Sequence, residues 1–161
     1  MRGWLKAIWN KFLPDKNVTT RAADGARGEQ AAADFLQARR GFSVVTRNWR
    51  DPRDRRDEID LVCSDGKVLV FVEVKARAEG ALVSGFLAVD DRKKRALRRV
   101  VHAYLSQLTH QPRSFRFDVV EVTLSGRLPP QVMHYENVPL FSKGYHVARQ
   151  SGSLDEVSEN L

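Results

Sequence analysis

Residues 68–75 read Val-Leu-Val-Phe-Val-Glu-Val-Lys, an apolar run that leads into a carboxylate and an amine. Such a β-branched run is typical of a strand that is buried on both faces. Charged side chains are rare in a buried strand unless they are paired, hold a metal ion or lie where the strand emerges. Because side chains alternate along a strand, Glu73 and Lys75 share one face, where they can position a metal ion and a phosphate.

A second strand that carries acids precedes this one. Residues 57–63 read Asp-Glu-Ile-Asp-Leu-Val-Cys, and the link to the next strand holds an Asp-Gly pair at 65–66, which favours a tight turn. A hairpin across this turn would bring Asp60 to the level of residues 70–71. Strand twist or a bulge would bring it closer to Glu73. Two acids and a lysine on adjacent strands form a much rarer pattern than Glu-x-Lys alone.

The composition predicts one domain with short extensions. The 161 residues are 42% hydrophobic, which suffices for a single core, and they carry a net charge of +7. A basic chain favours an anionic partner such as DNA, RNA or an anionic membrane, although basic residues also serve solubility alone. The single cysteine, Cys63, fits a reducing compartment, so we expect a cytoplasmic protein in which this thiol is buried in the core.

Three regions are expected along the chain. Residues 1–24 are predicted to form an amphipathic helix and a polar linker, residues 25–149 the folded domain, and residues 150–161 a disordered acidic tail. The N-terminal helix can dock on the domain, bind a partner or lie on a membrane surface, and docking is favoured. No segment is long and apolar enough to be predicted as a transmembrane helix.

The domain is expected to contain a helix, three strands, a second helix and further strands. Apolar spacing predicts helices over 27–40 and 90–108, and strands over 42–46, 58–77 (the hairpin), 115–122 and, at an edge, 132–136. The charged segment 51–56 and the small-residue segment 79–86 are expected to be loops. One mixed sheet flanked by helices satisfies this α/β order, and the glycine-rich loops of nucleotide-binding folds are missing from the sequence.

The acids and the lysine suit metal-assisted hydrolysis of a phosphodiester. Magnesium or manganese supplies this chemistry when one or two carboxylates hold it and leave positions open for water and phosphate. Asp60 and Glu73 are the expected metal ligands, and Lys75 would orient the water or stabilise the transition state. Glu29, in the first helix, is a further ligand, a base acting through water, or only a complement to the helix dipole. The four histidines lack the spacing of a zinc site.

Basic residues flank this candidate site. Such clusters bind phosphates with little reading of base sequence, and the alternative for each is an ordinary solvated surface. Trp49 either stacks on a base or packs in the core. The residues that we expect to contact nucleic acid are Arg47, Arg50, Arg77, Lys93, Lys94 and Arg98.

The order of these motifs resembles that of the YraN-type family of small, uncharacterised bacterial proteins. The shared elements are Gly28–Ala32, Arg47–Arg50, Glu58–Val62, Phe71–Arg77, Val89–Asp90 with Lys93, and Arg116–Val120. The resemblance covers about residues 26–122 and implies a restriction-endonuclease-like fold, similar to that of archaeal Holliday-junction resolvases. Their metal site combines a helix Glu, a strand Asp and a Glu-x-Lys motif. The matching positions are Glu29, Asp60, Glu73 and Lys75.

Two departures from the family pattern lie near the site. Asp57 stands where a glycine usually precedes Glu-Ile-Asp, and residues 84–86 read Ser-Gly-Phe in place of the usual Phe-Gly order. The acids and the lysine are intact. We therefore expect a magnesium- or manganese-dependent endodeoxyribonuclease, with structured or branched DNA as its substrate. The alternative is a non-catalytic nucleic-acid-binding protein on the same fold. The resemblance to junction resolvases also implies a homodimer.

Overall fold

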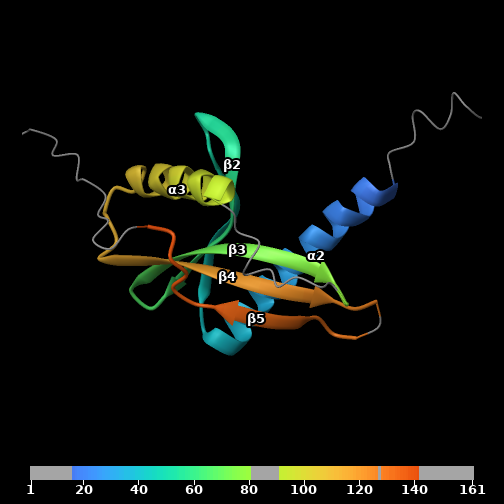
Figure 1. Ribbon diagram of the computed structural model, residues 1–161. Helices are drawn as coiled ribbons and strands as arrows, with labels where there is room; N and C mark the ends of the chain where they lie inside the picture. The colour runs from blue at the N-terminus through green and yellow to red at the C-terminus, as the bar shows by residue number, and fades with distance from the viewer. Residues whose placement is uncertain (1–15, 81–90, 127, 142–161) are drawn as a thin grey trace, which may run out of the picture.

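The computed structural model describes residues 16–80, 91–126 and 128–141 (Figure 1). The elements are α2 (Lys16–Arg40), β1 (Ser43–Asp51), β2 (Asp54–Asp65), β3 (Val68–Ala78), α3 (Asp91–Ser106), β4 (Ser114–Leu124) and β5 (Gln131–Tyr135). The strands form one sheet in the order β1-β2-β3-β4-β5. β3 and β4 are parallel and joined by the segment that contains α3, whereas the other neighbours are antiparallel. The predicted α/β class with a single mixed sheet is confirmed, and it is consistent with an endonuclease-like fold.

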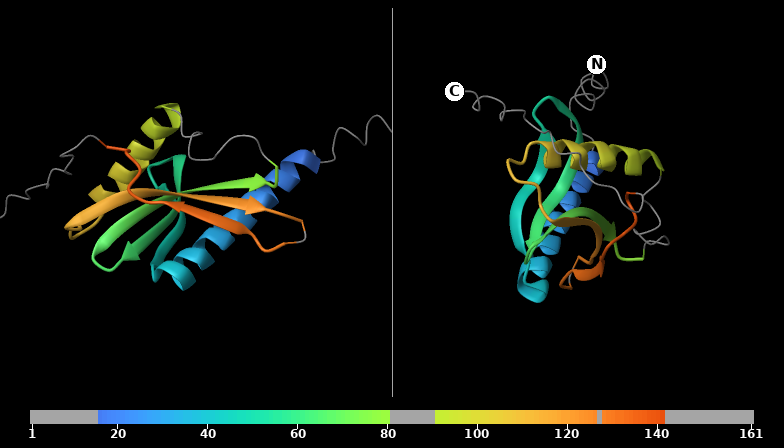
Figure 2. Two further views of the ribbon diagram at one scale, coloured as in Figure 1. Left: turned by 60° about the horizontal axis from the view of Figure 1, so that its bottom comes forward. Right: turned by 90° about the vertical axis from the view of Figure 1, so that its left-hand side faces the viewer.

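The sheet buries each of its faces against one helix, and Figure 2 shows the two helices on opposite sides. On β3, Val70 and Val72 face α2, whereas Phe71 faces α3, as expected for a strand buried on both faces. The core under α3 contains Ile59, Val62, Phe71, Leu97, Val101, Leu105 and Phe117. The core under α2 contains Ala32, Leu36, Leu61, Val70, Val72, Val120 and Val122.

Two segments differ from the prediction. α2 begins at Lys16, so most of the segment predicted as a linker within residues 1–24 is helical. Its side chains from residue 21 to 24 are exposed, so no apolar stripe marks this part of the helix in the sequence. The predicted loop 51–56 is instead the end of a β1–β2 hairpin, whose charged residues pair with one another and with side chains in or just after α3. One such pair joins Arg50 and Glu58.

The remaining predicted elements agree with the structure where it describes them. The second helix, the strand after it and the edge strand near residue 132 are all present as α3, β4 and β5. None of the helices in the described ranges is both long and apolar enough to cross a membrane. The helix predicted near the N-terminus, the loop 81–86 and the tail 150–161 lie outside the described residues.

The β2–β3 turn sets the register that positions the acids. Asp65 pairs with Val68, so the turn contains only Gly66 and Lys67, and Gly66 has a φ of 58°. A positive φ at the first of two turn residues is the conformation for which a type II′ turn uses glycine. Continuation of this register places Asp60 opposite Glu73. The prediction that Asp60 lies level with residues 70–71 of the neighbouring strand is therefore wrong.

A glycine brings α2 into close contact with the central strand. Gly28 is buried, and a Cβ atom added to it would lie 2.5 Å from the Cβ of Ala76 on β3. Real Cβ atoms do not approach this closely, so any larger residue at position 28 must push the helix away from the strand. Gly28 thus fixes the height of α2, and of Glu29 next to it, above the sheet.

Replacing Gly28 by Ala is expected to lower the free energy of unfolding by about 1–3 kcal/mol, because the added methyl group overpacks this contact. Equilibrium urea unfolding measures the change, and the double variant Gly28→Ala/Ala76→Gly should recover part of the loss. Gly25→Ala is the matched control, because nothing lies within 4 Å of a Cβ at that helical position. The control should gain up to about 1 kcal/mol. Equal stability of Gly28→Ala and wild type would contradict the account.

Candidate active site

The candidate site lies where β2 separates from β3. The pairing of these two strands ends at Leu61 and Val72, and the β1–β2 hairpin continues past α3 (Figure 1). Asp60 precedes Leu61 on β2, and its Oδ2 atom accepts a hydrogen bond of 2.7 Å from the backbone N–H of Val74. The carboxylate therefore provides the acceptor that a paired backbone carbonyl would otherwise provide. This bond holds Asp60 beside the end of the buried part of β3.

Glu73 is the buried acid of this site. Its side chain is 3% exposed, and its Oε1 atom lies 2.6 Å from the Nζ atom of Lys75 and 2.9 Å from that of Lys93. Its Oε2 atom is buried and finds no hydrogen-bond donor in the described part of the chain. A buried carboxylate oxygen without a partner costs roughly 1–3 kcal/mol or more, so Oε2 is suited to receive a ligand.

The two acids repel each other. Burial, and then the negative charge of Glu73, raises the pKa of Asp60 from 3.8 to about 7. The Val74 N–H and the Lys93 ammonium act in the opposite direction, whereas Glu29 on α2 adds a smaller increase. Glu29 is therefore close enough to act on Asp60 electrostatically. The site has more negative charge than its basic neighbours neutralise.

These residues fit a small divalent cation. Magnesium and manganese prefer carboxylate oxygens, and magnesium typically takes only one or two from the protein, with water or phosphate completing the set. Asp60 and Glu73 are two such acids at the same level of adjacent strands, and Oε2 of Glu73 has no donor among the described residues. No group of three or more His, Cys, Asp or Glu in the described ranges could hold a metal. Any metal here would depend on water or phosphate for its remaining ligands.

The structure groups the predicted site residues as follows. Asp60, Glu73 and Lys75 lie together, with Glu29 within electrostatic range of Asp60. Lys93, which the sequence suggested as a nucleic-acid contact, also forms an ion pair with Glu73, and its contact with nucleic acid stays a prediction. Sequence reasoning missed this role because the contact depends on how α3 packs over β3. The only signal was the position of Lys93 within a motif of the resembled family.

The other basic residues predicted to bind nucleic acid mostly have partners within the protein. A guanidinium has five N–H donors, so one internal contact leaves others available for phosphate. Their binding to nucleic acid stays a prediction, as does that of the half-buried Lys94. The internal pairs are Arg47 with Gln30, Arg50 with Glu58, Arg77 with Glu121, and Arg98 with the Leu140 carbonyl.

Two further residues have structural roles. The Trp49 ring packs edge-to-face on that of Tyr104 with 5.0 Å between centroids, which favours the core alternative over base stacking. Cys63 is buried, as expected, and burial raises the pKa of its thiol to about 11. The thiol therefore stays protonated near neutral pH and has little nucleophilic character.

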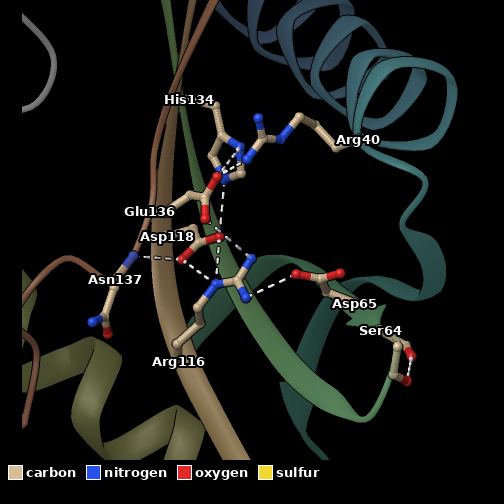
Figure 3. A network of polar contacts seen from close by, with 9 residues as sticks. Arg40, Ser64, Asp65, Arg116, Asp118, His134, Glu136 and Asn137 are labelled. Carbon is tan, nitrogen blue, oxygen red and sulfur yellow. Dashed lines mark hydrogen bonds and ion pairs between the residues drawn. The ribbon is translucent and has the colours of Figure 1, made fainter.

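A second polar network lies on the opposite face of the sheet and explains the Arg116–Val120 motif (Figure 3). Asp118 is fully buried and accepts hydrogen bonds from Arg116 at 3.1 Å and from the backbone N–H of Asn137 at 2.9 Å. His134 contacts its other oxygen at 2.9 Å. Arg116 also bonds at 2.9 Å to Asp65, the last residue of β2 before the β2–β3 turn. The network ties β4 to the residues around β5 and to that turn, so its role is structural.

Comparison with known sequences gives the family. The sequence model of the "Uncharacterised protein family UPF0102" matches residues 28–122, which contain all the candidate site residues. The chain belongs to the UPF0102 family. This is the YraN-type family that the sequence motifs resemble.

Curated UPF0102 proteins match most of this chain. One from Mycolicibacterium vanbaalenii is 40% identical over 119 residues, which cover 74% of this chain and 95% of the relative. One from Symbiobacterium thermophilum is 48% identical over 98 residues, or 61% of this chain and 80% of the relative. One from Koribacter versatilis is 35% identical over 135 residues, or 84% and 92% of the two chains. The UPF0102 similarity therefore extends over 80–95% of the length of these relatives.

Asp60→Asn is expected to stabilise this UPF0102 protein near neutral pH in metal-free buffer. A folded-state pKa of about 7 against an unfolded value near 3.8 means that the fold favours the protonated acid, so wild type loses stability as pH rises between these values. Asparagine does not ionise, and its side-chain oxygen can still accept from Val74. The stability of the variant relative to wild type should therefore increase as the pH rises from about 4 to about 8, by an amount on the order of a few kcal/mol. Urea unfolding at several pH values measures this gain, and a difference that does not change with pH would contradict it.

Proposed function

We propose that this UPF0102 protein is a metal-dependent nuclease that hydrolyses phosphodiester bonds in DNA, with structured or branched DNA as its substrate. The observation that carries the proposal is the buried Glu73 carboxylate, which has one oxygen without a donor in the described part of the chain and lies opposite a second acid. Burying two repelling acids is unfavourable for stability, and perturbed acids of this kind concentrate at functional sites. The UPF0102 relatives themselves carry no named activity.

Each residue has a chemical role in this proposal. Bound between Asp60 and Glu73, Mg²⁺ or Mn²⁺ would neutralise phosphate charge and acidify a water molecule. Lys75, held by Glu73 at 2.6 Å, presents an ammonium that can orient water or stabilise negative charge on the phosphate in the transition state. Glu29 supplies a third carboxylate near Asp60, which can take up a proton through water.

The charge of the molecule supports a nucleic-acid substrate. The chain carries a net charge of +7, and exposed arginines lie on the β1–β2 hairpin and on α3, the two elements that border the site. Such residues bind the phosphate backbone with little dependence on base sequence. Recognition of a DNA structure rather than a base sequence therefore suits this surface better than reading of base edges.

One observation favours a second candidate, a nucleic-acid-binding protein without turnover. Lys75 and Lys93 already neutralise the Glu73 carboxylate without any metal. A site whose buried acid is permanently paired in this way can serve stability alone. This candidate predicts binding that weakens with salt, needs no metal and is unchanged in Glu73→Gln.

Cleavage assays separate the two candidates. Wild type should cut four-way junction, flap, single-stranded or duplex DNA with Mg²⁺ or Mn²⁺ and lose the activity in EDTA. Glu73→Gln should lose about 10²-fold or more in rate, because it removes one charged group of the reaction centre. Glu58→Gln is the matched control, since Glu58 pairs with Arg50 on the hairpin. The nuclease proposal fails if wild type and Glu73→Gln show the same absent or residual activity on every substrate.

A further inference from the structure

Glu73 contacts two lysines that come from different elements. Lys75 lies two residues further along β3, and Lys93 lies in the first turns of α3. Both Nζ atoms approach the same oxygen, Oε1, at 2.6 and 2.9 Å. The Lys75 side chain is 23% exposed and that of Lys93 37%, against 3% for Glu73. One ammonium balances the Glu73 carboxylate alone, so the second one acts on the additional charge of the neighbouring Asp60 as well.

The position of Lys93 is unfavourable for the helix that carries it. The N-terminus of a helix has a partial positive charge, which favours acidic residues in the first turn and disfavours basic ones. α3 nevertheless begins Asp91-Arg92-Lys93-Lys94. The helix dipole therefore does not account for this lysine, whereas the neighbouring acids do. Lys93 forms an ion pair with Glu73 and also acts on the charge of Asp60.

Lys93 and a divalent cation would compete for the same acids. The attraction of Lys93 is directed at Glu73 and Asp60, the pair suggested above as metal ligands. Two positive charges a few ångströms apart repel strongly where burial lowers the local dielectric constant. Lys93 is the more exposed of the two lysines and reaches the site from a helix, so it can leave Glu73 more easily than Lys75 can.

We propose that Lys93 is a second positively charged residue of the active site, which neutralises Glu73 in the metal-free protein and binds the substrate phosphate when the metal is held. The inference rests on the proposed nuclease function and deepens it. The same ammonium would keep the two acids stable together before metal arrives and add a positive charge to the phosphate site afterwards. Lys75 stays with Glu73 in both situations.

Removal of the Lys93 charge should raise the affinity for metal and lower the rate of turnover. Lys93→Met removes the competing charge, so the full-length variant should bind Mn²⁺ about tenfold or more tightly by isothermal titration calorimetry. It should also cleave junction DNA about tenfold or more slowly, because a phosphate contact is lost. Lys94→Met is the matched control for metal binding and should keep the wild-type Mn²⁺ affinity. Lys93→Gln repeats the test in case the methionine variant folds poorly.

Three outcomes would overturn the inference. If Lys93 only fastens α3 to β3, its substitution lowers the free energy of unfolding but leaves the Mn²⁺ affinity at the wild-type value. If Lys93 instead assists the metal, affinity falls. In both cases the nuclease function of wild type still stands. If wild type neither binds Mn²⁺ nor cleaves any DNA, the proposed function fails together with the inference.

Discussion

A buried carboxylate on the central strand constrains the rest of this structure. Glu73 lies within the face of the sheet that α3 covers, where an unpaired charge would cost several kcal/mol. The site compensates for this in two ways: Lys75 follows on the same strand, and α3 brings Lys93 to the same oxygen. The packing of α3 and the chemistry of the site therefore depend on one another.

The second constraint is the separation of β2 from β3. If the two strands stayed paired beyond Leu61, a backbone carbonyl rather than the Asp60 carboxylate would meet the N–H of Val74. The separation lets Asp60 lie beside Glu73 and leaves the β1–β2 hairpin to extend past α3. On the other face, Gly28 holds α2 close to Ala76, and the Asp118 network ties β4 to its neighbours. The end of β3 that holds the candidate site is thus supported from both sides.

The sequence predicts what depends on local apolar pattern. The β3 run and the stripe of α3 are strong periodic signals, and both elements are present with nearly the expected bounds. The early start of α2 and the charged β1–β2 hairpin carry no such signal, because their side chains are exposed or paired with each other. The residue of β3 that lies opposite Asp60 was predicted wrongly, because the strand register depends on the length of the turn. One residue more or less in the turn changes every pair of the hairpin. The role of Lys93 depends on tertiary packing alone.

We propose that Asp60 and Glu73 together form a site for a divalent cation. The most direct test is a crystal of the full-length protein soaked in manganese, with anomalous diffraction used to locate the ion. We expect one anomalous peak between the Asp60 and Glu73 carboxylates, with the Lys93 ammonium moved away from Glu73. Soaked crystals in which manganese is absent from this position, with both lysines still on Glu73, would contradict the proposal.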